Sequence, residues 1–142
     1  MLFLGTAGDS PRELISFGDD WIESLAVHEA AGHIGLASGQ EVRVIDGHGR
    51  AAADFAPLSS TVSGIAFDAA GQRIAASRYN GVTVLNLDSG KVELTLDWKG
   101  SHIGVSWSPD GRYLVTATQE KELHIWDLVT MKDFRMGGYP RK

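Results

Sequence analysis

The sequence predicts an all-β protein made of tandem copies of one four-stranded unit, on the basis of three observations. Apolar residues recur at intervals of 40 positions, as in Val27, Phe67 and Trp107, and a fixed period of this length indicates a repeat architecture. Turn-forming pairs such as Asn80-Gly81 and Asp110-Gly111 separate short apolar runs. No stretch keeps a helical spacing of apolar residues over about ten positions.

The period divides the chain into a half unit at 1–20 and full units at 21–60, 61–100 and 101–138. Each full unit contains four expected strands, and the half unit matches only the third and fourth of them. The expected strands are Leu2–Gly5 and Glu13–Phe17 in the half unit; Trp21–Val27, His33–Ser38, Glu41–Ile45 and Arg50–Phe55 in the first full unit; Thr61–Phe67, Arg73–Ser77, Val82–Leu87 and Lys91–Leu96 in the second; and His102–Trp107, Arg112–Thr118, Leu123–Leu128 and Lys132–Met136 in the third.

The third unit shows the strand pattern most clearly. Ile103, Val105 and Trp107 alternate with small or polar residues, as expected for a strand with one buried face. The turn Ser108–Gly111 follows, in which proline presets one φ angle and glycine tolerates a positive one. In the second unit the last strand alternates polar residues such as Glu93 with apolar ones, which is typical of an outer edge strand.

The other units are placed by their alignment with the third. Val44 and Val84 fall in the column of Ile125, and Leu4 falls in the column of Val44. The pattern therefore extends to the N-terminus, where only half of a unit is present.

Composition and charge exclude several classes of protein. Thirteen basic and eighteen acidic residues among 142 give a net charge of −5 and a pI near 5.4, whereas nucleic-acid-binding domains usually have a basic face and a pI above about 9. Cysteine is absent, which excludes disulfides and thiolate ligands. No apolar run approaches the ~20 residues that span a bilayer. We therefore expect a cytoplasmic protein that binds neither nucleic acid nor membrane.

The segment from Ser106 to Leu128, SWSPDGRYLVTATQEKELHIWDL, closely resembles the WD-repeat β-propeller family, with Trp126-Asp127 as the family dipeptide. The resemblance implies a radial array of four-stranded antiparallel blades, the first strand innermost, that acts mostly as a rigid scaffold for protein partners. The earlier units resemble the family more weakly and have Leu85-Asn86 and Ile45-Asp46 at the dipeptide. Such divergent repeats are common in bacterial members.

The family resemblance also implies a structural hydrogen-bond network of His, Ser or Thr, Asp and Trp. His102, Thr118 and Trp126 match this pattern, and Glu120 stands where the family has Asp. The first and second units lack the set. We therefore expect a structural role for His102, Thr118, Trp126 and Asp127.

The sequence offers no catalytic, cofactor-binding or metal-binding constellation. The five histidines lie in different strands and loops, without the close spacing typical of shared ligands, and we expect His124 to point outward. Most aspartates lie at turns, where hydrogen bonding to the local backbone explains them. No Gly-x-Ser-x-Gly elbow occurs. We therefore expect no bound cofactor or metal.

The family resemblance implies that the turns between second and third strands and the connections between units lie on one face, which is often the binding face. Tyr79 and Trp98 are the most suggestive residues, because aromatic side chains in polar loops behave as interface anchors. The alternative is that each packs against a neighbouring blade. For Trp21, at the start of an inner strand, we expect a structural role. The candidate partner-binding residues are Arg78, Tyr79, Asn80, Trp98, Lys99, Gln119, Glu120 and Lys121.

Two functions compete at this point. The first is a non-catalytic interaction scaffold with a protein partner. The alternative is part of a propeller-fold enzyme, a hydrolase or quinone-dependent dehydrogenase, whose site residues lie mostly outside this chain. Because three and a half blades do not close a ring, we also expect a fragment of a longer propeller. Its missing blades would then be partners too, and residues 1–142 alone would not form a stable monomer.

Overall fold

The computed structural model describes residues 2–4, 12–15 and 22–137. All the regular structure in these ranges is β-strand, which confirms the all-β prediction. The strands are β1 Leu2–Leu4, β2 Arg12–Ile15, β3 Ser24–His28, β4 His33–Ser38, β5 Glu41–Asp46, β6 Ala51–Asp54, β7 Gly64–Phe67, β8 Arg73–Asn86, β9 Lys91–Trp107, β10 Tyr113–Thr118, β11 Glu122–Asp127 and β12 Lys132–Gly137.

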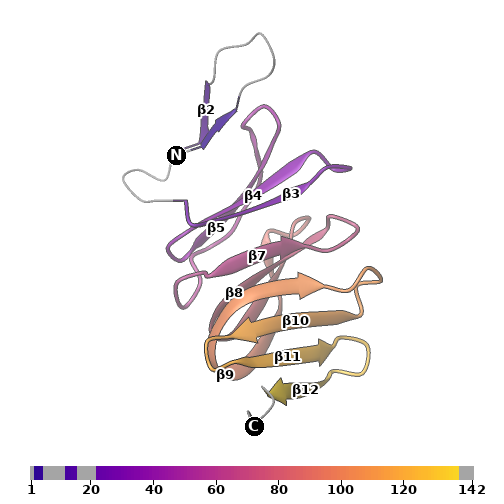
Figure 1. Cartoon of the computed structure of the whole chain (residues 1–142). Coiled ribbons are helices and arrows are strands. Elements are labelled where there is room, and N and C mark those ends of the chain that lie inside the picture. The colour runs from indigo at the N-terminus through magenta and orange to yellow at the C-terminus, as the bar shows by residue number, and fades with distance from the viewer. Residues whose placement is uncertain (1, 5–11, 16–21, 138–142) are drawn as a thin grey trace.

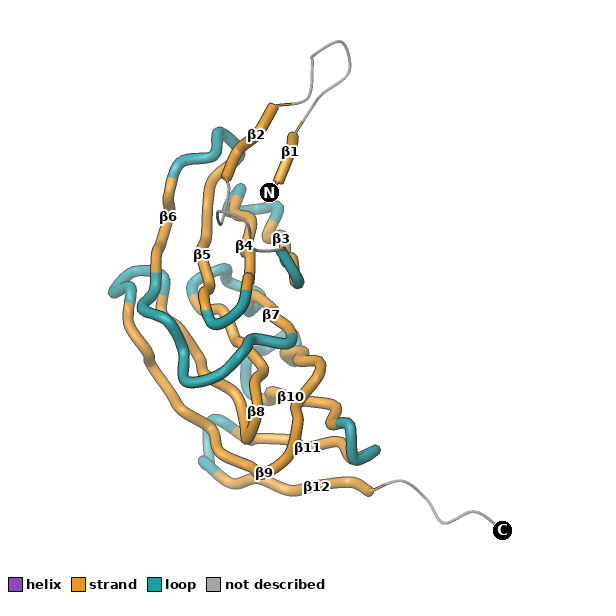
Figure 2. The backbone as a smooth tube through the Cα atoms, turned by 90° about the vertical axis from the view of Figure 1, so that its left-hand side faces the viewer, coloured by secondary structure: helices purple, strands orange, loops and turns teal. Residues whose placement is uncertain are grey.

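The sheets follow one another along the chain as consecutive blades (Figure 1). The first blade has the strand order β3-β4-β5-β6, and these strands lie side by side in Figure 2. The second blade consists of β7, β8 and the first part of β9, and the third of the last part of β9 with β10, β11 and β12. Before them, β1 and β2 form an antiparallel pair at the predicted half unit. Trp21 lies outside the described residues.

The predicted forty-residue columns are confirmed in the strand register. The last residue of each predicted first strand faces an apolar residue seven positions further on in the next strand, and β3 lies beside β7 and β7 beside β9. The three pairs are Val27 with Ile34, Phe67 with Ile74, and Trp107 with Leu114. The common column also predicts equivalent depths for Val27, Phe67 and Trp107. This is wrong for Val27, which is 65% exposed, because no complete blade precedes β3 in the described ranges.

Two strands are longer than predicted. β8 contains the second and third expected strands of its blade and folds back at Asn80 and Gly81, whose φ angles are 65° and 144°. β9 joins the outer strand of the second blade to the inner strand of the third. It does so without a break because Ser101, at the corner, still pairs with Tyr79 of β8.

Two apolar cores lie between consecutive blades. We call the side of a blade that meets the preceding blade its front face and the opposite side its back face. The back face of the first blade and the front face of the second share the core of Val42, Val44, Ala53, Ile65, Ile74 and Leu85. The back face of the second blade and the front face of the third share the core of Ala75, Val82, Val84, Leu96, Leu114 and Trp126.

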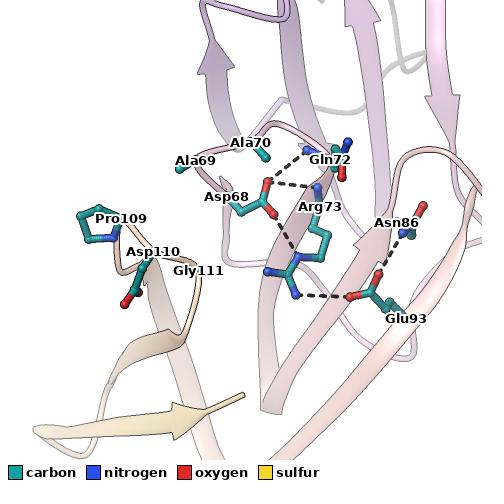
Figure 3. A pocket seen from close by; sticks show the side chains of 10 residues that line it. All are labelled: Asp68, Ala69, Ala70, Gln72, Arg73, Asn86, Glu93, Pro109, Asp110 and Gly111. Atoms are coloured by element: carbon teal, nitrogen blue, oxygen red, sulfur yellow. Dashed lines mark hydrogen bonds and ion pairs between the residues drawn. The ribbon is translucent and has the colours of Figure 1, made fainter. Parts of the chain in front are cut away.

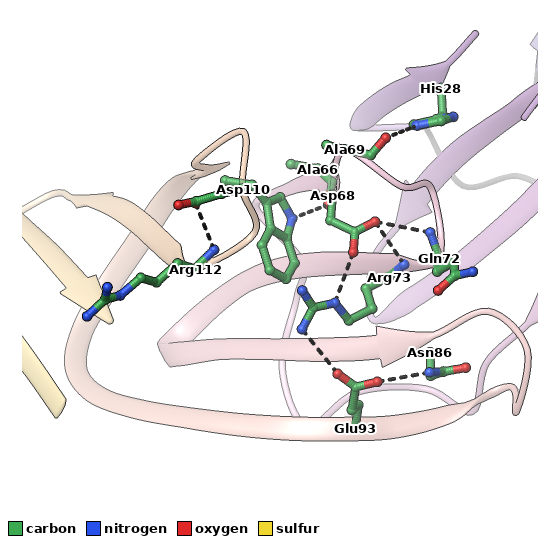
Figure 4. Close-up of polar contacts among 11 residues, drawn as sticks. His28, Ala66, Asp68, Ala69, Gln72, Arg73, Asn86, Glu93, Asp110 and Arg112 are labelled. Carbon is green, nitrogen blue, oxygen red and sulfur yellow. Dashed lines mark hydrogen bonds and ion pairs between the residues drawn. The ribbon is translucent and has the colours of Figure 1, made fainter. Parts of the chain in front are cut away.

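Polar side chains also join the blades. The Trp107 indole donates from Nε1 to the Ala66 carbonyl at 2.9 Å, from the third blade to the second. His28 of the first blade accepts from the Ala31 amide at Nδ1, so its Nε2–H donates to the Ala69 carbonyl at 2.8 Å (Figure 4). Each bond satisfies a backbone carbonyl of the second blade.

Candidate protein-binding face

A hollow of about 260 Å³ opens where the second and third blades meet, on the face predicted to bind partners. The turn of β8, the corner of β9, the turn between β10 and β11, and β12 all contribute to it. Its lining residues are Tyr79, Trp98, Lys99, Gly100, Thr118, Glu120, Glu122 and Arg135.

The corner of β9 is held by the turns on either side of it. The Gly100 amide donates to Asn80 Oδ1, and the Ser101 amide donates to Glu120 Oε1, each at 3.0 Å. Gly100 has a φ of 117°, and a Cβ there would lie 2.5 Å from the Glu120 carboxylate. The three backbone segments under the hollow are therefore fixed relative to one another.

His102 connects the second blade to the third. Its Nε2–H donates to the Trp98 carbonyl, and its Nδ1 accepts from Thr116 Oγ1, both at 2.7 Å. The sequence assigned this hydroxyl to Thr118, which is wrong, since Thr118 Oγ1 instead accepts from the Glu122 amide. The register explains the error, because a bulge separates the pairing of Thr118 from that of the rest of β10.

An aromatic stack lies beneath the hollow. The rings of Trp98 and His124 are stacked with centroids 4.5 Å apart, and Trp126 meets His124 edge-on at the same distance. His124 is buried and bonds Asp133 Oδ2 through Nε2 at 2.7 Å, so the expectation that it points outward is wrong. The side chains of His124 and Trp126 lie on the same side of β11, and this side faces the second blade. The exposed guanidinium of Arg135 lies 5.8 Å from the Trp98 ring.

The aspartate of the family dipeptide closes the turn after β11. Asp127 Oδ1 accepts from the Val129 amide, and its carboxylate takes two hydrogen bonds from Arg112. These hydrogen bonds hold the pKa of Asp127 well below its ordinary value. Asp46, the counterpart in the first blade, accepts from the amides of His48 and Arg50 in the same way. The aspartate of the dipeptide therefore keeps its role in closing the turn in the first blade, where Ile45 replaces the tryptophan.

The structure brings together only some of the predicted partner-binding residues. Four of them line the hollow: Tyr79, Trp98, Lys99 and Glu120. Asn80, Gln119 and Lys121 are exposed on the flanking turns but do not line it. Arg78 is buried, with Nε donating to Thr83 Oγ1 at 2.8 Å, so it supports the turn from within.

Four residues of the hollow were not among the predicted partner-binding residues, namely Gly100, Thr118, Glu122 and Arg135. Glu122 and Arg135 form an ion pair of 3.4 Å across β11 and β12. They are separated by 13 positions in the sequence, and no local motif links them. The antiparallel pairing of the two strands brings them together, which the sequence pattern could not show.

A second, larger hollow of about 430 Å³ lies on the opposite face, between the turns that follow β7 and β9 (Figure 3). Arg73 crosses it and donates to Asp68 Oδ2 at 2.9 Å and to Glu93 Oε2 at 3.3 Å (Figure 4). The guanidinium also lies over the Trp107 ring, 4.6 Å from its centroid. Both carboxylates belong to the second blade, as Arg73 does, so the ion pairs hold that blade together, and the contact of the guanidinium with Trp107 extends the network to the third blade.

The described residues place no three His, Asp or Glu side chains where they could hold a metal ion. Within the same ranges, no helix is long and apolar enough to cross a membrane.

Mild acid is expected to destabilise the joint at His102. Burial lowers the pKa of His102 below its ordinary value of 6.5, although the bond to the Trp98 carbonyl acts against this. Just below pH 6.5, His102 therefore binds a proton in the unfolded chain but remains neutral in the folded chain. The free energy of unfolding then falls by up to about 1.4 kcal/mol per pH unit. Urea titrations at pH 7 and 5.5 measure this loss. His102→Gln should reduce it, while the same change at exposed His48 should not.

The antiparallel four-stranded sheets and the dipeptide-capped turn define this chain as a set of β-propeller blades. Residues 90–127 match the family model described as WD domain, G-beta repeat. Over 66 residues the chain is 35% identical to the WD repeat-containing protein SL1-17 of Schistosoma mansoni, a match that covers 45% of this chain and 22% of that relative. Residues 90–127 are thus similar to a WD repeat, and the chain matches about a fifth of that relative's length.

Proposed function

We propose that the chain is a non-catalytic, cytoplasmic interaction module that binds a protein partner at the hollow between the second and third blades. WD repeats generally mediate protein–protein interaction. The observation that supports this site is the exposed Tyr79 side chain, 60% accessible, at the rim of a hollow that Trp98 also lines. Aromatic residues around a recess are typical of binding hot spots.

The surroundings of Tyr79 favour a preformed site. The corner of β9 below it is fixed by Asn80 and Glu120, and Trp98 is stacked on His124. Loops that are already ordered lose little conformational entropy on binding. The charges around the recess are mixed, with Lys99 and Arg135 beside Glu120 and Glu122, so a partner with both apolar and polar contacts fits it best.

Site-specific photo-crosslinking tests this proposal. A photoreactive phenylalanine analogue is placed at Tyr79, or at the exposed control position Ala70 on the opposite face, in the native cells. We expect discrete adducts with another protein from position 79 only. Tyr79→Ser should then weaken binding of that protein by about tenfold or more while the melting temperature stays unchanged. Equal labelling from both positions, or none from 79, would contradict the assignment.

A further inference from the structure

A cleft of about 220 Å³ opens at the outer strands, where the first and second blades meet. The connection after β6 forms one wall, the start of β9 forms the other, and Leu85 of β8 lies beneath them. We call it the rim cleft, and its apolar lining includes Phe55, Pro57, Leu58 and Val92. Val92 lies opposite Leu85, on the side of the second blade that faces the first. It is nevertheless 52% exposed, because the space between these two blades is open at this point.

The joint between the second and third blades is filled at the corresponding place. Trp126 stands at the position that Leu85 has in the second blade, and it is 5% exposed. When the outer strands at 50–55 and 91–96 are aligned, Trp98 corresponds to Pro57. Trp98 packs against the same core as Trp126. The rim cleft therefore lies where the next joint of the same chain holds two indole rings.

Lys91 is the charged residue in the lining of the rim cleft. Its side chain is exposed and forms no ion pair within the described part of the chain. The carboxylate of Glu93, in the same strand, is already bonded to Arg73 and Asn86. An acidic group from outside the chain can therefore pair with the Lys91 ammonium at the edge of an apolar surface, where a charge-assisted hydrogen bond gains in strength.

We propose that the rim cleft binds an aromatic side chain of a protein partner, and that an acidic residue beside it in the partner pairs with Lys91. An aromatic ring supplies a large apolar area to a small cleft, as Trp98 and Trp126 do at the next joint. The rim cleft shares no lining residue with the hollow between the second and third blades. This inference is therefore independent of the function proposed for that hollow.

Short synthetic peptides test the proposal on the full chain. The probe is Asp-Trp-Asp with blocked ends. The matched peptides are Asp-Ala-Asp, which lacks the ring, and Lys-Trp-Lys, which reverses the charge. Heteronuclear NMR of the isotopically labelled chain reports both the binding position and the affinity. We expect Asp-Trp-Asp to shift the amide signals of Gly90 and Val92, and to bind at least about tenfold more tightly than either matched peptide.

Charge reversal at Lys91 provides a second measurement. Lys91→Glu should invert the preference, so that Lys-Trp-Lys binds more tightly than Asp-Trp-Asp. Lys132→Glu is the matched control, because Lys132 is also exposed and also begins the outer strand of its blade. This control should keep the preference of the unmodified chain. Thermal melts verify that both variants fold.

Three results would overturn the proposal: no shift at Gly90 and Val92, equal binding of Asp-Trp-Asp and Asp-Ala-Asp, or a preference that Lys91→Glu leaves unchanged. Shifts confined to the surroundings of Tyr79 and Trp98 would also overturn it. The aromatic side chain would then occupy the hollow between the second and third blades instead of the rim cleft.

Discussion

Gly81→Ala is expected to lower the free energy of unfolding by about 3 kcal/mol or more. Gly81 has a φ of 144°, which L-residues rarely adopt, and a Cβ there would collide with the backbone carbonyl oxygen of Leu96. The neighbouring strand cannot move away without breaking its ladder with β8. Urea titration followed by far-ultraviolet circular dichroism measures the loss.

Two other glycines separate the causes of this effect. Gly39 has a φ of 57° but nothing within 4 Å of its Cβ position, so Gly39→Ala tests strain without collision and should cost about 1 kcal/mol. Gly104 is equally open and has no positive φ, so Gly104→Ala should be near neutral. If Gly81→Ala costs no more than Gly39→Ala, the close approach to Leu96 is not what selects glycine there.

Trp107→Ala is expected to cost about 3–5 kcal/mol. The indole packs against the core between the second and third blades and donates to the Ala66 carbonyl. Its removal leaves a cavity and deprives that carbonyl of a donor, and the Arg73 guanidinium loses the ring beneath it. The denaturation midpoint should fall with little change in m-value. A loss below about 1 kcal/mol would mean that this indole does not hold the two blades together.

Trp98 provides the comparison for Trp107. The sequence placed it in a loop, where Trp98→Ala would cost about 1 kcal/mol or less. The loop assignment is wrong, since Trp98 lies within β9, stacks on His124 and packs against the core between the blades. We therefore expect a loss nearer about 2 kcal/mol, still smaller than that of Trp107→Ala.

The sequence predicted the fold well because period and alternation are local signals. Val27, Phe67 and Trp107 identify the repeat, and their cross-strand partners follow from the common turn length. The continuity of β9 through Ser101 could not be read in this way. It depends on pairing with Tyr79, which is brought to the corner by the fold of the preceding blade.

The candidate site was predictable only where it lies in turns. Tyr79 and Glu120 flank the recess as the repeat indicated. By contrast, the Arg78 side chain points inward and hydrogen-bonds to Thr83. Arg135 lines the recess because β12 pairs with β11. Side-chain direction at a strand end depends on register, and a bulge such as that beside Thr118 changes it by one residue.

The unbroken course of β9 has a consequence for how such chains can grow or shrink during evolution. The family match at residues 90–127 begins at the last residue of the turn that precedes the outer strand of one blade and ends with the third strand of the next. The matched sequence repeat therefore does not coincide with one blade, because it combines the outer strand of one blade with the first three strands of the next. Deleting residues 90–127 would leave β7, β8 and β12 to supply four strand segments to one sheet, whereas cutting at Ser101 would divide one continuous strand. A boundary in the turn before β9 therefore allows a whole sequence unit to be removed without cutting a strand.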